Sequence, residues 1–496
     1  MIFIYLLSGL FLGWSFGAKD TGNVFGSAVE TKMLSFQKAA LIASIFVTLG
    51  AVLEGSGPSQ TLSRLGSVNE LGGAFTVALA AAATITLMVR IGIPVATSQT
   101  LAGAIIGWNY FAGRLTDYSS LAAIAGSWLL APLLGGIFAA VLFFVFRAYL
   151  QKAKLHLLEL DMGTRYGLLV VGAFGAYSLG ANNIANIVGI FVPVNPFRDV
   201  AVPAMGIVSG ETQLYLLGSA SIILGIYTYS HKIMKTVGKE LFGLSSITAL
   251  ITVLAESIVL FLFSSKGLHN LMINLGLPAI PLVPVSASQI IVGSVLGIGL
   301  AKGGKNIRYN LLGRISMGWV MAPLIAFLFS FVALFIVQNV FEQKVQHSNH
   351  YDFNRTTITK LEQSGVDSRY LYTVNGRKFE NQRALYLELR KTGHYDRQNL
   401  LKIIRITEAY PLEVNTQLLK DKGMDKYLSQ ARWSTLQLLE GQKYLYKWQL
   451  ADALAKYTAW KPRQGMSQEA DKRFNQGLES NLNLLYGIFY TPVSGK

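Results

Sequence analysis

The chain contains no cysteine and little charge. Only 14% of its 496 residues are Asp, Glu, Lys or Arg, whereas a soluble domain carries about 25%. The missing cysteines exclude disulfides, thiolate metal sites and cysteine nucleophiles. No group of His, Asp and Glu has metal-ligand spacing, and no glycine-rich phosphate loop follows a strand pattern. We therefore expect no enzyme, no resident cofactor and no nucleic-acid partner.

Hydrophobic residues are abundant instead, at 52% of the chain, and they gather in long runs. Leu71–Met88, Leu121–Phe146 and Ile315–Val337 approach the ~20 residues that cross the hydrocarbon core of a bilayer. We interpret Met1–Phe16 as a first span, because no small-residue cleavage site of a signal peptide follows it. The sequence predicts an integral membrane protein, and we expect it in the inner membrane of a bacterium.

A polar stretch flanked by glycines follows an apolar run at two places. Gly17–Gly26 reads GAKDTGNVFG, and Gly180–Gly189 reads GANNIANIVG. Lipid tolerates such interruptions only where protein or a cavity covers them, and an intramembrane ionisable pair such as Lys19 and Asp20 indicates a functional site. The two copies predict a duplicated transporter with one interrupted helix in each half.

A second pair of motifs repeats in the same order. Pro94–Gln99 reads PVATSQ and Pro284–Gln289 reads PVSASQ. A Trp-x-x-x-Pro pattern follows 34 residues after the first proline and 35 after the second. A proline followed by hydroxyls and an amide suits the start of a helix. Because the apolar piece Thr100–Trp108 is too short to cross a bilayer, we predict a re-entrant hairpin in each half.

The distribution of charged residues indicates a domain boundary near residue 341. Residues 1–341 hold 19 Lys and Arg against 11 Asp and Glu, whereas the much shorter segment 342–496 holds 24 against 16. No spanning run follows Val340, and the later segments show mixed apolar and polar helical patterning. We therefore predict three parts: transporter repeat 1 at 1–150, transporter repeat 2 at 151–340, and a soluble, mainly helical C-terminal domain of unknown role at 341–496.

These motifs resemble the inorganic phosphate transporter family, whose halves each carry a Gly-Ala-Asn-Asp-Val-Ala-Asn type signature. The resemblance covers most of residues 1–340 and includes Phe25–Val29, Ala43–Phe46 and Lys235–Lys239. It implies an all-α membrane protein with two inverted repeats, about ten spanning helices, two re-entrant helical hairpins and an anion site between the repeats. Members of the family are generally secondary transporters driven by sodium or protons.

A tetrahedral oxyanion in a low dielectric needs many hydrogen-bond donors and some positive charge. Helix N-termini supply free N–H groups and a favourable dipole. We expect the substrate to bind between the two signatures and the two half-helix starts, at Lys19, Asp20, Thr97, Ser98, Gln99, Asn182, Asn183, Ser286, Ser288 and Gln289. The alternative is that the hydroxyl and amide side chains only cap the half-helices.

The resemblance also implies cation coupling, which we expect to involve Asp20, Asn23, Asn186 and Glu256. A co-transported Na⁺ would bind at Asp20, Asn23 and Asn186, and the two asparagines are expected to hold unwound backbone or supply cation ligands. Lys19 replaces a family Asn and Asn183 a family Asp, so the site gains two positive charges. We hypothesise that the Lys19 ammonium takes the place of a sodium ion, leaving Asp20 or Glu256 to carry a proton. The alternative is that Lys19 reaches the membrane interface and only pairs with Asp20.

The sequence leaves alternatives open for the substrate, for the class of protein and for its orientation in the membrane. A carboxylate such as Asp20 favours phosphate, which can donate a hydrogen bond, whereas Asn182 and Asn183 resemble the sulfate permease branch of the family. Proteins of another class, an anion channel or a membrane scaffold with a signalling tail, rank lower. A basic connection between the halves favours the cytoplasm, which would place the C-terminal domain in the periplasm or outside the cell. A homodimer is among the expected assemblies.

Overall fold

The computed structural model forms two compact units, Met1–His347 and Ser348–Lys496. Pro94 and Lys235–Lys239, two features noted in the sequence, lie outside the described residues. Each unit is described by itself. The structure describes residues 2–66, 68–91, 93, 95–153, 156–197, 199–202, 206–231, 234, 246–304, 309–347, 350–421, 425, 428–463 and 469–491.

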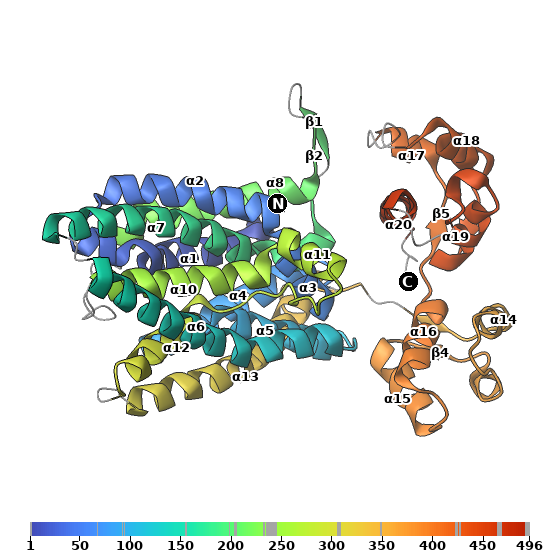
Figure 1. The fold of residues 1–496 in the computed structure, drawn as a ribbon. Helices are drawn as coiled ribbons and strands as arrows, with labels where there is room; N and C mark the ends of the chain where they lie inside the picture. The colour runs from blue at the N-terminus through green and yellow to red at the C-terminus, as the bar shows by residue number, and fades with distance from the viewer. Residues whose placement is uncertain are drawn as a thin grey trace. The chain divides into compact units, whose positions relative to one another are not determined.

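The first unit is a bundle of helices that lie side by side (Figure 1). In chain order its main elements are α1 (Ile2–Glu30), α2 (Phe36–Glu54), α3 (Ser56–Gly66), α4 (Leu71–Arg90), α5 (Thr97–Phe111), α6 (Tyr118–Ala153), α7 (Leu157–Val188), η1 (Gly189–Val194), β1 (Val200–Val202), β2 (Gly206–Val208), α8 (Gly210–Gly225), η2 (Ile226–Ser230), α10 (Ser246–Ser264), α11 (Lys266–Asn274), α12 (Ala287–Ala301) and α13 (Tyr309–Asn339).

Six helices within the described ranges are long and apolar enough to cross a membrane. They are α2, α4, α6, α7 with η1, α10 and α13. Their outward faces carry many exposed apolar side chains, such as Leu129 and Leu133 on α6, which are 78% and 60% exposed. Water would penalise such faces and hydrocarbon accepts them, so these helices define an integral membrane protein.

The expected interruptions at the two signature stretches are wrong. Helix α1 continues through Lys19, Asp20 and Asn23, and α7 continues through Asn186 to Val188. Asn23 and Asn186 therefore do not hold unwound backbone. An unbroken helix satisfies its own backbone groups, and the buried amide and carboxyl groups of the two helices can contact one another.

Two shorter helices, α5 and α12, correspond to the predicted half-helices. Each has 15 residues, which gives a length of about 22 Å, shorter than the ~30 Å hydrocarbon core. Non-helical residues precede both helices. Ser286 caps α12, because its side chain accepts a hydrogen bond of 3.4 Å from the backbone N–H of Gln289.

The packing of the bundle is reciprocal between its first and second halves. Helix α1 packs against α8 while α7 packs against α2, and α5 packs against α13 while α12 packs against α6. Gly103 of α5 lies against the backbone of Pro323, and Gly293 of α12 lies against the backbone of Pro132. A Cβ atom at either glycine would overlap with these atoms, so the small residue allows the close approach.

The second unit contains two similar arrangements of helices around a short antiparallel strand pair. Its elements are β3 (Tyr351–Asp352), α14 (Arg355–Gln363), η3 (Leu371–Val374), β4 (Lys378–Phe379), α15 (Gln382–Lys391), α16 (Arg397–Thr407), β5 (Leu412–Glu413), α17 (Thr416–Asp421), α18 (Gln430–Leu438), β6 (Lys443–Tyr444), α19 (Lys447–Ala455), η5 (Thr458–Trp460) and α20 (Glu469–Phe489). Strand β3 pairs antiparallel with β4, and β5 pairs in the same way with β6.

The two pairings match in detail. Gly376 and Gly441 each precede the second strand with a positive φ, of 79° and 75°, a backbone conformation that favours glycine. A Lys on the second strand faces an acid on the first in both copies, with N–O distances of 3.8 Å and 3.5 Å. The sequences LYTVNGRKF and LQLLEGQKY that lead into these strands are correspondingly alike, so the unit contains an internal duplication.

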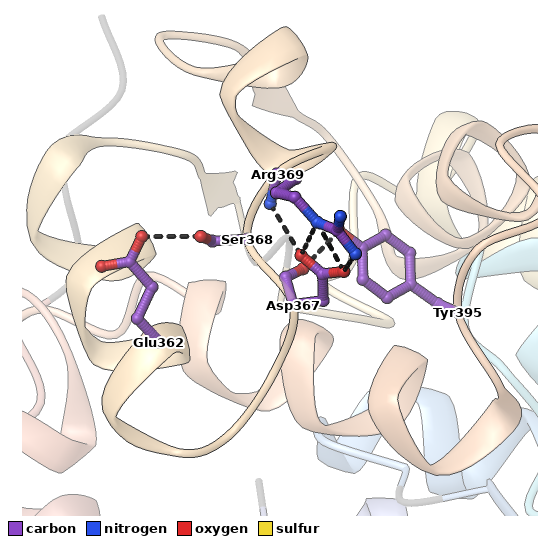
Figure 2. A network of polar contacts seen from close by, with 5 residues as sticks. All are labelled: Glu362, Asp367, Ser368, Arg369 and Tyr395. Atoms are coloured by element: carbon purple, nitrogen blue, oxygen red, sulfur yellow. Dashed lines mark hydrogen bonds and ion pairs between the residues drawn. The ribbon is translucent and has the colours of Figure 1, made fainter.

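A polar network orders one loop of the first copy (Figure 2). The Arg369 guanidinium contacts the Asp367 carboxylate at 2.6 Å, and the Tyr395 hydroxyl donates to the Asp367 carbonyl at 2.7 Å. Hydrogen bonds from Arg369 lower the pKa of Asp367 to about 2. The Ser368 hydroxyl donates to Glu362, which connects the loop to α14.

Candidate functional site

The two signature helices meet through their polar side chains. The Asn183 amide of α7 donates a hydrogen bond of 2.9 Å to Oδ2 of Asp20 on α1. Asp20 is only 5% exposed, and Asn183 only 4%. A buried carboxylate without a partner is costly, so this amide stabilises Asp20 inside the bundle.

Lys19 turns to a different partner. Its ammonium donates a hydrogen bond of 3.1 Å to the Ser288 hydroxyl, in the first turn of α12. Lys19 and Asp20 are not within ion-pair distance of each other, and the two charges contact different elements of the second half. Lys19 is exposed, as the alternative expected, but the expected pair with Asp20 is not formed.

Asn182 holds the backbone just before α12. Its side-chain oxygen accepts from the Val285 N–H at 2.8 Å, and its amide donates to the Val285 carbonyl at 2.8 Å. The same amide nitrogen is 3.0 Å from Oδ1 of Asn183. Asn182 therefore holds the backbone that leads into α12. It does not line the cavity described next.

The signature residues and half-helix starts line one small cavity with a volume of about 10 Å³, close to the space that one water molecule needs. All of its polar lining was predicted, and its apolar lining consists of Phe16, Val285 and Ala287. Sequence reasoning missed these three, although each is adjacent or close to a predicted residue and periodicity alone could have suggested Phe16, one turn before Asp20. The predicted residues in the lining are Lys19, Asp20, Thr97, Ser98, Asn183, Asn186, Ser286 and Ser288.

The remaining predicted residues are buried nearby without lining this cavity. Asn23, Gln99, Asn182, Gln289 and Glu256 are each at most 4% exposed. Glu256 of α10 is fully buried, and its carboxyl group lies near enough to Asp20 for the two acids to interact electrostatically. The structure thus gathers all the candidate residues in one region, but divides them between a lining and a surrounding shell.

Several buried polar atoms in this region have no hydrogen-bond partner among the residues that the structure describes. An unsatisfied buried polar group costs about 1–3 kcal/mol, more if charged, so a cluster of them is typical of a site that binds water, ions or a polar ligand. The atoms are Ser98 Oγ, Gln99 Oε1, Asn186 Oδ1, Asn23 Nδ2, both amide atoms of Gln289 and both carboxyl oxygens of Glu256.

Apolar helices of spanning length around a partly open, charged and hydrogen-bonding cavity are the features of a helical membrane transporter. Comparison with known proteins gives the family. The chain belongs to the phosphate transporter family, whose model matches residues 16–330 and 273–385. The second match extends to residue 385, further than the resemblance seen in the sequence alone.

Relatives show the same coverage. A protein of Methanocaldococcus jannaschii named "Putative phosphate permease" is 25% identical over 66% of this chain and 95% of its own length. A protein of the same name from Haemophilus influenzae is 22% identical over 69% of this chain and 97% of its own. The solved structure of "the sodium-dependent phosphate transporter" aligns with a TM-score of 0.52 and 20% identity, over 68% of this chain and 98% of that one, which supports the fold.

Proposed function

We propose that the protein is a secondary-active transporter that carries inorganic phosphate together with a cation. The observation that supports this most directly is the single cavity lined by Lys19, Ser98, Asn186 and Ser288. These residues come from both signature helices and from the first turns of both half-helices. Membership of the phosphate transporter family and the names of its relatives point to the same substrate.

The chemistry of the cavity suits a protonated oxyanion. The Lys19 ammonium and the Ser98 hydroxyl can donate to phosphate oxygens, and the two half-helix N-termini direct free N–H groups toward the same region. Phosphate near neutral pH keeps a proton and can donate to the Asp20 carboxylate. Sulfate has no proton to donate, so the carboxylate favours phosphate over sulfate.

The architecture we propose for transport has two inverted repeats, about ten spans and two re-entrant hairpins. Support comes from the reciprocal packing, in which each half-helix contacts the long helix that follows the other half-helix. Support also comes from α5 and α12, which are of equal length and too short to cross the bilayer. The cavity would then lie near the membrane midplane, where the two halves meet.

For coupling, we propose that the Lys19 ammonium supplies the positive charge that a sodium ion would otherwise bring. Asp20 and the fully buried Glu256 then remain as carriers of a coupling proton, since no basic side chain among the described residues forms an ion pair with either carboxyl. The alternative is a Na⁺ site at Asp20, Asn23 and Asn186. Either cation would be co-transported rather than resident.

Uptake of radiolabelled phosphate into proteoliposomes tests both proposals. We expect saturable uptake that unlabelled phosphate competes for more strongly than sulfate, and that persists when choline replaces sodium. Lys19→Gln should abolish it, whereas Lys38→Gln, on the exposed surface of α2, should not. Preferential competition by sulfate would contradict the substrate, a strict sodium requirement would contradict the role of Lys19, and unsaturable flux independent of any gradient would indicate a channel.

We also propose that the membrane is a bacterial inner membrane and that the C-terminal unit lies outside the cytoplasm. The basic connection between the halves supports this orientation by the positive-inside tendency. Protease added to intact cells or spheroplasts should then remove residues 348–496 and leave a membrane fragment. Protection of the C-terminal unit would reverse the orientation.

A further inference from the structure

The two halves contain corresponding positions that make different contacts. Lys19 and Asn182 are each the third residue of a glycine-flanked signature stretch. Val95 and Val285 each stand between a predicted hairpin proline and the start of a half-helix, α5 and α12 respectively. At these two pairs of positions, the two halves of the bundle differ in their hydrogen bonds.

In the second half, the signature residue holds the start of the half-helix. Asn182 makes two hydrogen bonds of 2.8 Å to the N–H and carbonyl of Val285, because an amide side chain can accept and donate at once. Val285 and Asn182 are both buried, so neither bond competes with bulk water. The backbone before α12 is thereby fixed to helix α7.

In the first half, this two-bond contact is missing. Lys19 has an ammonium group, which donates but cannot accept, so it cannot reproduce what Asn182 does. It contacts Ser288 of the other half-helix instead. Among the residues that the structure describes, no side chain hydrogen-bonds to the backbone of Val95.

The remaining parts of the two half-helices are packed alike. Gly103 of α5 lies against Pro323 of α13, and Gly293 of α12 lies against Pro132 of α6, in both cases at backbone contact. The difference between Asn182 and Lys19 acts at the N-terminal ends of the half-helices, next to the cavity, whereas this glycine contact is the same in both.

A larger cavity lies beside the unclamped end. Its volume is about 460 Å³, and it shares Phe16, Lys19 and Thr97 with the small cavity of the site. Val95 is in its lining, whereas Val285 is not. Open space therefore borders the α5 start at Val95 and Thr97, whereas Val285 at the α12 start lines only the small cavity among the pockets described.

We propose that the start of α5 is the segment that moves to admit the anion, and that Asn182 is a positioning residue that keeps the start of α12 fixed. This inference rests on the proposed function, because it describes how the substrate of that cavity enters. It also assigns a second consequence to Lys19, whose presence at this position leaves the α5 start without its clamp.

The absence of cysteine from the chain makes a direct test feasible, since any thiol is then an introduced one. Val95→Cys and Val285→Cys report on the two equivalent backbone positions in proteoliposomes, by their rates of modification with a water-soluble methanethiosulfonate reagent. We expect Cys at position 95 to react faster by about tenfold, because two buried hydrogen bonds oppose opening at position 285. Added phosphate should slow the reaction at position 95.

Two second-site changes separate clamping from simple exposure. Lys19→Asn introduces the amide that the first half lacks and should slow modification at position 95. Asn182→Ala removes the clamp and should accelerate modification at position 285, whereas Asn182→Gln, which keeps an amide, should restore part of the protection. Thr97→Cys and Ala287→Cys form a second equivalent pair if either valine substitution prevents folding.

Equal rates at the two positions, or rates that do not respond to Lys19→Asn and Asn182→Ala, would overturn the inference. The rates are measured without transport, so they are distinguishable from failure of the proposed function. If the asymmetry in labelling is present but neither uptake nor protection by phosphate is observed, the moving segment stands and the substrate assignment fails.

Discussion

The Lys19 ammonium of α1 lies 3.1 Å from the Ser288 hydroxyl of α12, although the two residues are 269 positions apart in the chain. One comes from the signature helix of the first half and the other from the half-helix of the second. The bond places a positive charge at the edge of the cavity and connects the halves there. An anion between them would contact the same two groups.

Removal of the acceptor should weaken substrate binding. We expect Ser288→Ala to raise the phosphate concentration for half-maximal uptake by about tenfold or more, since one hydrogen bond to a charged group contributes roughly 1.5–3 kcal/mol net of water. Ser63→Ala, at a half-buried serine of α3 whose hydroxyl donates to the Gln60 carbonyl away from the site, serves as the control. Unchanged uptake kinetics in Ser288→Ala would remove this residue from the site.

The amide that holds Asp20 should matter for stability as well as transport. Asn183→Leu leaves the buried Asp20 carboxyl without its 2.9 Å hydrogen bond, which we expect to cost about 1–3 kcal/mol. Thermal unfolding in detergent should show a lower midpoint, and Asn183→Leu with Asp20→Asn should recover part of the loss. Independent, additive effects of the two substitutions would contradict the contact.

Glu256 should act in coupling rather than in substrate binding. We expect Glu256→Gln to lose accumulation of phosphate driven by a proton gradient and to retain exchange of internal for external phosphate. Glu342→Gln, an exposed acid, should change neither. Retention of gradient-driven uptake in Glu256→Gln would exclude this carboxyl as the proton carrier and leave Asp20.

The close packing of the half-helices gives a prediction independent of function. Gly103→Ala and Gly293→Ala place a Cβ against the backbone of Pro323 and Pro132, and we expect each to destabilise the protein by about 1–3 kcal/mol. Gly126→Ala is the control, because nothing lies within 4 Å of its added Cβ. Thermal unfolding measures all three, and equal midpoints would contradict the packing.

The Asp367 carboxyl, in a loop of the C-terminal unit, should titrate at an unusually low pH. Arg369 lowers the pKa of Asp367 from its ordinary 3.8 to about 2. The folded-state pKa is the lower one, so this contact stabilises the fold above pH ~4 and is lost as pH falls through 2. We expect the ¹³C signal of the Asp367 carboxyl to titrate near pH 2, and Arg369→Ala to move its midpoint toward 3.8. A wild-type midpoint near 3.8 would contradict the pair.

Much of the helical pattern was accessible from sequence because hydrocarbon imposes a simple rule on length and polarity. The run Leu71–Met88 predicted α4, and the polar start of Pro94–Gln99 placed the beginning of α5 at Thr97 within a few residues. The signature stretches were wrongly expected to break α1 and α7. Glycines and polar residues shorten the apolar run that a sequence shows. In a bundle, however, the polar side chains can contact other helices and the helix continues.

What the sequence determined by itself was the membrane class, the recurrence of its motifs and the kinds of groups available at the site, since these depend on composition and order alone. Tertiary structure decided which group each of these residues contacts. Only packing places Lys19 on Ser288 rather than on its neighbour Asp20, and turns Asn182 toward the backbone of Val285 while Asn183 contacts Asp20. Adjacent residues on a helix point about 100° apart, so their partners depend on which helices surround them.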